Sequence, residues 1–297
     1  MGIALITPFQ KNGEVDYPAL SRLLDYQLQN EADYFVVLGT TAETPTLTMS
    51  EQKEITRFVI DKVNKRVKIV LGISGNNTKA LVDRLKTEDL EGVDGILSVV
   101  PYYNKPSQEG IYQHYKAIAQ AVSIPLILYN VPGRTGVNMS AETTLRLAHE
   151  FHHVLGVKEA SGNWSQIGAI VKSKPDYFQV VSGDDAITFP LISLGIVGVI
   201  SVLGNAFPKE LRRMVHLAAL DDDYVEALQI HKRFIELYEL LFADGSPSGI
   251  KCVLNLKGFI ENELRLPLVP VQKTTEEKIQ KVLQELNDVK IIDDDEY

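Results

Sequence analysis

The chain has 297 residues, of which 45% are hydrophobic and 23% are charged, as in an ordinary globular enzyme. Its formal net charge of -9 argues against a nucleic-acid partner, because phosphate binding requires a basic surface. Cys252 is the only cysteine, which excludes an internal disulfide and a thiolate-clustered metal site and fits a reducing cytoplasm. No apolar run reaches the roughly 18 residues that would suggest a membrane helix. We expect a cytoplasmic protein that binds small molecules, with neither nucleic acid nor membrane as a partner.

Short apolar runs rich in β-branched residues recur along the first two thirds of the chain. Each is too continuously apolar for an exposed antiparallel strand and predicts a strand buried on both faces. The eight predicted strands are Ile3–Thr7, Tyr34–Leu38, Lys68–Ile73, Gly95–Val100, Pro125–Asn130, Val154–Glu159, Phe178–Ser182 and Gly198–Val202.

Amphipathic stretches with helical periodicity lie between these runs. They are Tyr17–Gln29, Ser50–Val63, Thr78–Leu90, Gly110–Ala121, Ala141–His149 and Trp164–Lys172. Asp16 and Ser50 are the predicted start signals of the first two helices. Strict alternation of strand and helix predicts a parallel sheet, either open or closed into a barrel. Eight units favour closure, so the predicted fold is α/β, a (β/α)8 TIM barrel.

The alternation stops after Val202. The remaining helical patterns are Phe207–Leu220, Tyr224–Phe242, Gly249–Glu263 and Thr274–Leu286. The first closes the eighth unit, and the other three predict a helical extension packed on the barrel. We therefore place a catalytic barrel domain at residues 1–222 and a C-terminal helical extension at 223–297. The acidic runs Asp221–Asp223 and Asp293–Glu296 are interpreted as a solvated loop and tail.

Reactive or unusual residues follow the predicted strands, where a barrel of this kind builds its active site. The strand ends carry Thr7-Pro8, Gly39-Thr40-Thr41-Ala42-Glu43, Pro101-Tyr102-Tyr103-Asn104, Tyr129 to Gly136 and Ser182-Gly183-Asp184-Asp185, while Lys158 lies within the sixth strand. A catalytic site predicts such clustering of reactive residues at the strand ends, whereas packing of the barrel does not require it.

Lys158 stands inside the apolar run Val154–Glu159, and strand alternation places it on the face opposite Val157 and Glu159. Burial disfavours the charged amine, so its pKa is expected to fall from about 10.4 toward neutrality. A neutral amine attacks a ketone to form an imine, and the protonated imine is an electron sink. The competing interpretation is a surface ion pair between Lys158 and Glu159.

Imine formation also needs a proton shuttle, which hydroxyl groups can supply. The candidates are Tyr129, Thr40, Thr41, Tyr102 and Tyr103. A pair of tyrosines taken alone more often reflects amphipathic packing. The glycine-flanked loop after Tyr129 carries Arg134, which is suited to holding a substrate carboxylate in a bidentate manner.

The chain resembles the dihydrodipicolinate synthase/N-acetylneuraminate lyase family over essentially its whole length. The matching segments, in order, are Ala4–Phe9, Gly39–Thr44, Pro101–Pro106, Tyr129–Gly136, Gly156–Asn163 and Ser182–Asp185. Arg134 after Tyr-Asn-Val-Pro resembles the synthase branch, in which the arginine receives the carboxylate of aspartate semialdehyde. The resemblance thus implies a lyase of lysine and diaminopimelate biosynthesis that joins pyruvate to L-aspartate-4-semialdehyde and gives 4-hydroxy-tetrahydrodipicolinate.

The same resemblance implies roles for individual residues. Lys158 would carry the pyruvate imine, with no other cofactor and no metal, and Tyr129, Thr40 and Tyr103 would form the proton relay. The residues that would contact pyruvate are Thr41 and Gly183, which position its carboxylate, and Ile200, which lines the pocket. In such enzymes the tyrosine matching Tyr103 reaches the active site of a neighbouring subunit, which implies a homotetramer built as a dimer of dimers.

Two departures from the family pattern have consequences. Ala42 stands where the family often has glycine, so the loop after Thr41 is expected to differ slightly. Lysine-inhibited synthases carry an acidic residue where this chain has Ala80, and often a histidine where it has Met49. Although Tyr102 and Asn76 remain, we expect weak or absent feedback inhibition by lysine.

Other interpretations stay open on the sequence alone. The same imine chemistry serves lyases of N-acetylneuraminate or of 2-keto-3-deoxy sugar acids, and a barrel could also bind a metabolite without turning it over. His149-Glu150-Phe151-His152-His153 matches the pattern of zinc metalloproteases, which requires both outer histidines on one helical face. The helix is expected to end here, because a strand begins at Val154, so we predict no zinc site.

Overall fold

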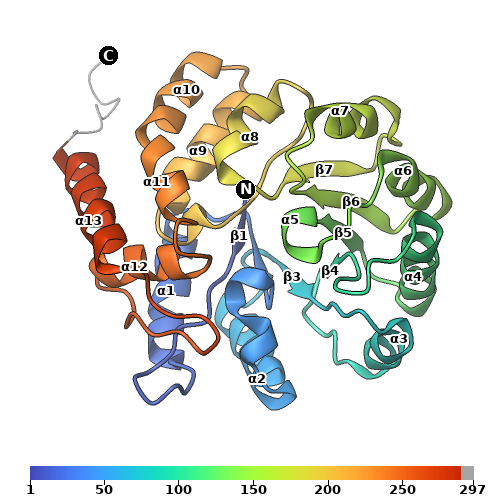
Figure 1. Ribbon diagram of the computed structural model, residues 1–297, viewed down its shortest axis with the longest axis horizontal. Helices are drawn as coiled ribbons and strands as arrows, with labels where there is room; N and C mark the ends of the chain where they lie inside the picture. Colours follow the sequence, from blue (N-terminus) through green and yellow to red (C-terminus); the bar gives the residue numbers. More distant parts are fainter. Residues whose placement is uncertain (289–297) are drawn as a thin grey trace.

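The computed structural model describes residues 1–288 and shows a parallel eight-stranded barrel surrounded by helices (Figure 1). The strands are β1 (Gly2–Ala4), β2 (Tyr34–Val37), β3 (Lys68–Gly72), β4 (Gly95–Val99), β5 (Leu126–Asn130), β6 (Val154–Glu159), β7 (Gln179–Ser182) and β8 (Ile200–Ser201). Neighbours pair in the order β7-β6-β5-β4-β3-β2-β1-β8. A parallel bridge between Ser182 and Val199 joins the two ends, so the sheet closes and the predicted (β/α)8 barrel is confirmed.

The helices follow the strands in alternation. Those of the barrel are α1 (Tyr17–Gln29), α2 (Met49–Val63), α3 (Thr78–Thr87), α4 (Gln108–Ala121), α5 (Pro132–Thr135), α6 (Ala141–Glu150), α7 (Trp164–Ser173), α8 (Asp185–Ile192) and α9 (Pro208–Ala219). Short 3-10 turns η1 (Thr40–Ala42), η2 (Thr44–Thr46) and η3 (Leu203–Asn205) follow strands. The sequence had not predicted α8, an apolar helix that contains Pro190.

Side-chain hydrogen bonds shorten two predicted strands. The expected first strand Ile3–Thr7 pairs only as far as Leu5, because the Ile6 amide donates to Asn205 Oδ1. The expected eighth strand ended at Val202, but the amides of Val202 and Leu203 donate to Asp185 Oδ2. In both places a buried side chain replaces a neighbouring strand as the partner of the main chain.

Of the two predicted helix start signals, one is confirmed and one is wrong. Asp16 caps α1 by accepting from the Ala19 amide, as predicted. Helix α2 begins after Thr48 and not after Ser50, because Thr48 and Glu51 form a reciprocal capping box.

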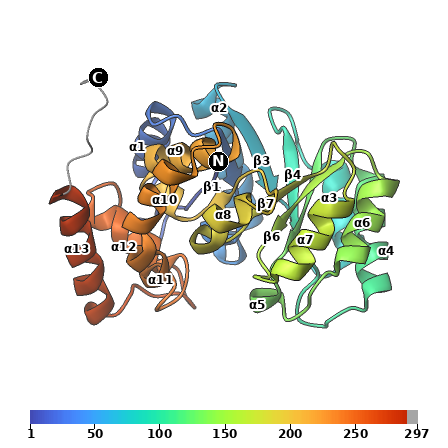
Figure 2. The ribbon, with the colours of Figure 1, turned by 90° about the horizontal axis from the view of Figure 1, so that it is seen from above.

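Beyond residue 223 lie α10 (Tyr224–Arg233), α11 (Ile235–Leu240), α12 (Ser248–Leu256) and α13 (Lys273–Asp288). The predicted helix Tyr224–Phe242 is broken at Phe234, which takes non-helical dihedrals and packs on Phe207. The predicted helix Gly249–Glu263 ends at Leu256, and Gly258 follows with φ of +78°. Figures 1 and 2 show these elements on the side of the barrel near α1, away from α4 and α6.

The two acidic runs have different outcomes. Asp221–Asp223 is an exposed loop, as predicted, in which Asp223 also caps α10. Asp293–Glu296 lies outside the described residues.

The core has two layers, as the fold requires. A large apolar cluster fills the space between the strands and the outer helices. A second buried cluster fills the barrel and consists of Ala4, Val36, Val70, Leu97, Tyr129, Val131 and Ile200. Because successive side chains of a strand point to opposite faces, every second residue of a strand is directed into this interior. Tyr129 is the one polar group of the interior cluster, and it marks the site described next.

Candidate active site

Lys158 lies next to Tyr129 at the carboxyl ends of adjacent strands. The two residues are register partners on β6 and β5, and the Lys158 Nζ atom lies 4.5 Å from the centroid of the Tyr129 ring. Val157 belongs to the outer core, and the Glu159 carboxylate accepts hydrogen bonds from the side chains of Asn130 and Gln166. The predicted facing of Lys158 is confirmed, and Glu159 is engaged on the other side of the strand.

Burial makes the Lys158 amine a better nucleophile than an ordinary lysine. The side chain is 5% exposed, and loss of hydration lowers the pKa of its amine to about 8. The negative charge of Asp185 acts in the opposite direction, and the positive charge of Arg134 lowers the pKa further. At pH 7 about one molecule in ten therefore carries a neutral amine, compared with about one in a few thousand for a free lysine.

Gly183 makes room for the lysine side chain. A Cβ atom at this position would lie 2.9 Å from Lys158 Cε and 2.8 Å from the Cβ of Ala160. The Gly183 amide also donates to the Glu159 carbonyl at 2.8 Å, which fixes the end of β7 beside β6. The absence of a side chain at Gly183 thus sets the path of Lys158 toward Tyr129.

The Tyr129 hydroxyl meets the loop after β2. Thr40 hydrogen-bonds to it, and although burial raises the pKa of Tyr129, both this bond and the charge of Arg134 act to lower it. Thr40 and Thr41 belong to the turn η1, in which the Glu43 amide donates to the Thr40 carbonyl at 3.1 Å. A chain of hydroxyl groups therefore leads from the buried Tyr129, next to the lysine, to the exposed Thr40, as a proton relay requires.

Ala42 does not take a positive φ, as its methyl group leads one to expect, and the predicted difference from the family's loop stays a prediction. Ala42 is a buried member of the 3-10 turn, and the residue with the left-handed conformation is Glu43, with a φ of +56°. Thr7, in the segment that follows β1, donates its hydroxyl to the Ala42 carbonyl at 2.8 Å. The positive φ of this turn therefore falls on Glu43 and not on Ala42.

A cavity of about 290 Å³ opens beside these residues. Thr40, Tyr129 and Arg134 line it, together with Tyr102 and residues of α2, β3 and β4. Arg134 is an exposed residue of the short helix α5, so its guanidinium can meet a ligand that enters from solvent. Lys158 adjoins the cavity through the Tyr129 ring and is not itself a lining residue.

The other predicted site residues are placed differently. Thr41 and Ile200 are buried next to the relay and in the barrel interior respectively. Tyr103 is 87% exposed with a φ of +77°, and does not meet Lys158 within its own chain. An exposed tyrosine held in a strained conformation is consistent with a role toward a second copy, which remains a prediction.

Sequence reasoning gave no role to Asp185, which proves to be part of the electrostatics of the site. Its Oδ2 atom accepts from the amides of Val202 at 2.9 Å and Leu203 at 2.8 Å, and its negative charge raises the pKa of Lys158. Burial raises the pKa of the Asp185 carboxyl itself. Its position in the Ser-Gly-Asp-Asp segment was the available signal.

The histidines of the metalloprotease-like pattern are separated, as predicted. Helix α6 ends at Glu150, the ring of His149 contacts the Ser173 carbonyl, and the ring of His153 contacts the Ala119 carbonyl. Within residues 1–288 no group of three or more His, Cys, Asp or Glu residues could hold a metal ion. In the same residues, no helix is both long and apolar enough to cross a membrane.

Comparison with known proteins identifies relatives of the whole chain. Residues 1–286 match the model of the dihydrodipicolinate synthetase family. The 4-hydroxy-tetrahydrodipicolinate synthase of Parabacteroides distasonis is 63% identical over 97% of this chain and 96% of its own length. The protein of the same name from Phocaeicola vulgatus is 62% identical over 96% of both chains.

Solved structures agree with these sequences. The dihydrodipicolinate synthase of Aquifex aeolicus superposes with a TM-score of 0.92 at 40% identity, over 96% of this chain and 97% of that one. The enzyme of Cyanidioschyzon merolae, solved with lysine bound, gives 0.93 at 39% identity over 97% and 98%. The chain has a buried lysine beside a tyrosine in its barrel and matches these proteins over nearly its whole length. It belongs to the dihydrodipicolinate synthetase family.

Proposed function

We propose that the chain condenses pyruvate with L-aspartate-4-semialdehyde to give 4-hydroxy-tetrahydrodipicolinate, through an imine on Lys158. The observation that carries the proposal is the buried Lys158 amine, with a pKa of about 8, beside the hydroxyl-bearing ring of Tyr129. The relatives described above bear the name of this synthase and not of a sialic acid or sugar acid lyase.

The neutral amine of Lys158 attacks the C2 carbonyl of pyruvate and forms a carbinolamine. Loss of water gives the protonated imine, which draws electrons from the methyl group and allows one of its protons to leave. The resulting enamine attacks the aldehyde carbon of the semialdehyde, and the new carbon–carbon bond forms. The amino group of the semialdehyde then attacks the imine carbon and displaces the Lys158 amine, which closes the ring of the product and frees the lysine. Each proton transfer needs a hydroxyl close to Lys158, and Tyr129 with Thr40 is so placed.

Neighbouring residues complete the proposed site. Tyr103 of a second copy of the chain extends the relay, and Thr41 and Gly183 hold the pyruvate carboxylate. Ile200 lines the pocket in the barrel interior, where it is fully buried. No cofactor other than the lysine imine takes part.

Arg134 receives the carboxylate of the semialdehyde. Its guanidinium lies at the cavity and near enough to Tyr129 and Lys158 for its charge to lower both pKa values. An aldehyde whose carboxylate binds Arg134 would present its carbonyl carbon toward the enamine. A neutral sugar chain has no such group, and this favours the semialdehyde over a sugar acid lyase reaction.

The proposed enzyme is a cytoplasmic homotetramer arranged as a dimer of dimers, with the domain boundary at residue 222. The exposure of Tyr103 supports the dimer, since the relay is incomplete within one chain. A monomeric variant of dihydrodipicolinate synthase, 39% identical to this chain, has also been characterised. Sedimentation velocity of the purified chain tests the assembly.

Borohydride reduction in the presence of pyruvate tests the chemistry. Wild-type protein should gain one reduced pyruvate unit on a peptide containing Lys158, whereas Lys158→Ala should gain none. Turnover of aspartate semialdehyde and of N-acetylneuraminate is then compared. An unmodified Lys158 would overturn the imine, and faster turnover of the sugar would overturn the choice of acceptor.

A further inference from the structure

The loop that carries Thr40 and Thr41 is tied to the C-terminal segment by a buried ion pair. Lys251 of α12 binds the Glu43 carboxylate, and both side chains are fully buried. The Lys251 ammonium also donates to the Glu263 carbonyl at 2.9 Å and lies 4.2 Å from the centroid of the Phe9 ring. A buried pair of this kind gives little net stability, because desolvation offsets the attraction, so the pair matters more for what it positions than for the free energy of folding.

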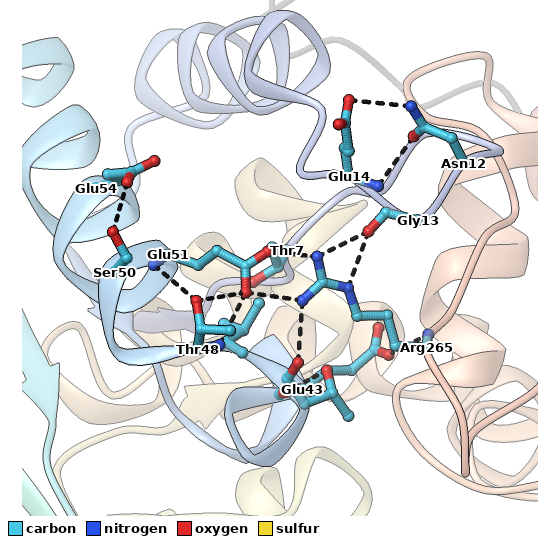
Figure 3. Close-up of polar contacts among 12 residues, drawn as sticks. Thr7, Asn12, Gly13, Glu14, Glu43, Thr48, Ser50, Glu51, Glu54 and Arg265 are labelled. Carbon is cyan, nitrogen blue, oxygen red and sulfur yellow. Dashed lines mark hydrogen bonds and ion pairs between the residues drawn. The ribbon is translucent and has the colours of Figure 1, made fainter.

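Arg265, in the loop after α12, also joins the C-terminal segment to Glu43. Its amide donates to the second oxygen of Glu43 at 3.0 Å, so the carboxylate is held on both sides. Its guanidinium donates to the Gly13 carbonyl, the Thr46 carbonyl and the Glu51 carboxylate. Figure 3 shows the guanidinium between Gly13 and Glu51 and above Glu43. Arg265 of the C-terminal segment thus binds the main chain at Gly13, before Glu43, and at Thr46, after it.

Glu43 passes this restraint to the catalytic turn through its backbone. Its φ of +56° is a conformation that a residue with a side chain rarely adopts, and its amide donates to the Thr40 carbonyl. Its own carbonyl accepts from both the amide and the hydroxyl of Thr46. Fixing the Glu43 carboxylate therefore fixes the turn in which Thr40 meets the Tyr129 hydroxyl.

We propose that Glu43, clamped by Lys251 and Arg265, is a positioning residue that holds Thr40 and Thr41 for imine formation on Lys158. The C-terminal helices, which supply no group to the reaction, thereby take part in setting its rate. This inference rests on the proposed function. Misplacement of a relay by about 1 Å costs about a hundredfold in rate, which sets the scale of the expected effect.

The double variant Glu43→Gln with Lys251→Met tests the role, because it leaves no unpaired buried charge. It should fold with the circular dichroism spectrum and assembly state of the wild type. With pyruvate alone, the rate of imine trapping by borohydride should fall between about tenfold and a hundredfold, since residue 43 is then held only from the Arg265 side. The pyruvate concentration for half-maximal trapping should rise as well, because Thr41 moves with the turn.

Lys257→Met is the matched control. Lys257 belongs to the same segment and is partly buried, whereas Lys251 is fully buried. Like Lys251, it donates to a main-chain carbonyl, that of Ala206, and packs on aromatic rings, those of Phe207 and Tyr26. It should lose similar stability and trap the imine at the wild-type rate. Wild-type trapping in the double variant, or equal slowing in Lys257→Met, would overturn the positioning role. Absence of trapping in the wild type would instead overturn the proposed function.

Discussion

The ammonium nitrogen of Lys158 lies 4.5 Å from the centroid of the Tyr129 ring, on the neighbouring strand of the barrel. This relationship places a nucleophile beside the hydroxyl of Tyr129, to which Thr40 in the turn after β2 hydrogen-bonds. It also removes the amine from water, which lowers its pKa to about 8. Nucleophile, relay and pKa shift thus have a common origin in the register of β5 and β6.

The rate of imine formation should depend on pH through the Lys158 amine. Only the neutral amine attacks pyruvate, so the rate should rise as pH increases through about 8 and level off above it. Asp185→Asn removes a negative charge that raises this pKa, so its profile should move to lower pH. The rate of borohydride trapping, measured from about pH 6 to about pH 10, gives the profiles of the wild type and of Asp185→Asn. A profile that does not move in Asp185→Asn would show that the carboxylate is already neutral.

Tyr129→Phe should separate the hydroxyl from the ring. The phenyl ring still covers Lys158 and fills the interior cluster, so folding should be unaffected. Loss of the proton relay should slow imine formation about a hundredfold or more. Thermal unfolding provides the control, and a variant that traps pyruvate at the wild-type rate would exclude Tyr129 from the relay.

Arg134→Ala should distinguish the two half-reactions. Loss of a charged hydrogen bond to the semialdehyde should lower kcat/KM for that substrate about tenfold to a hundredfold. Imine formation should change much less, and its pH profile should shift upward because Arg134 lowers the pKa of Lys158. Steady-state kinetics with each substrate varied provides the measurement. Equal losses for both substrates would contradict the assigned role.

Gly183→Ala should block the reaction by sterics alone. The new methyl group would lie 2.9 Å from Lys158 Cε, inside van der Waals contact, so the lysine would have to leave its position beside Tyr129. Trapping of pyruvate should fall to near the level of Lys158→Ala while the fold persists. The matched substitution Gly75→Ala meets no atom within 4 Å and should leave trapping unchanged.

Lysine should inhibit the enzyme weakly or not at all. Ala80 and Met49 offer no carboxylate or imidazole to an amino acid ligand, although Asn76 still donates to the Tyr102 carbonyl at 3.3 Å. Arg84 also lines the cavity, but its guanidinium pairs with Glu88 at 2.8 Å, so that carboxylate is already engaged. Activity measured against increasing lysine tests this, with Ala80→Glu as the variant expected to gain sensitivity. Strong inhibition of the wild type would show that these positions do not control binding.

The sequence already contained the strand rhythm and the strand-end residues. Lys158 could be identified because a lysine within Val154–Glu159 interrupts an apolar pattern, and the facing of Lys158 follows from alternation. Lys251 carried the same signal, a lysine within the apolar segment Ser248–Leu256, yet its helix was predicted without a role for it. A helix has no fixed partner face that sequence can name, so its buried cation could not be assigned.

By itself, the sequence determined the barrel, the lysine and the order of the motifs, because these depend on local periodicity and residue type. Only the tertiary structure decided the pairing of Glu43 with Lys251 and Arg265, which lie more than 200 residues away. It also decided the ends of β1 and β8, where Asn205 and Asp185 take over main-chain hydrogen bonds. The physical reason is the same in each case: buried polar groups must find partners, and which partners are near is a property of the folded chain. For Lys158, periodicity sufficed to predict burial, whereas the loss of hydration that lowers its pKa to about 8, and the opposing charges of Asp185 and Arg134, exist only in the closed barrel.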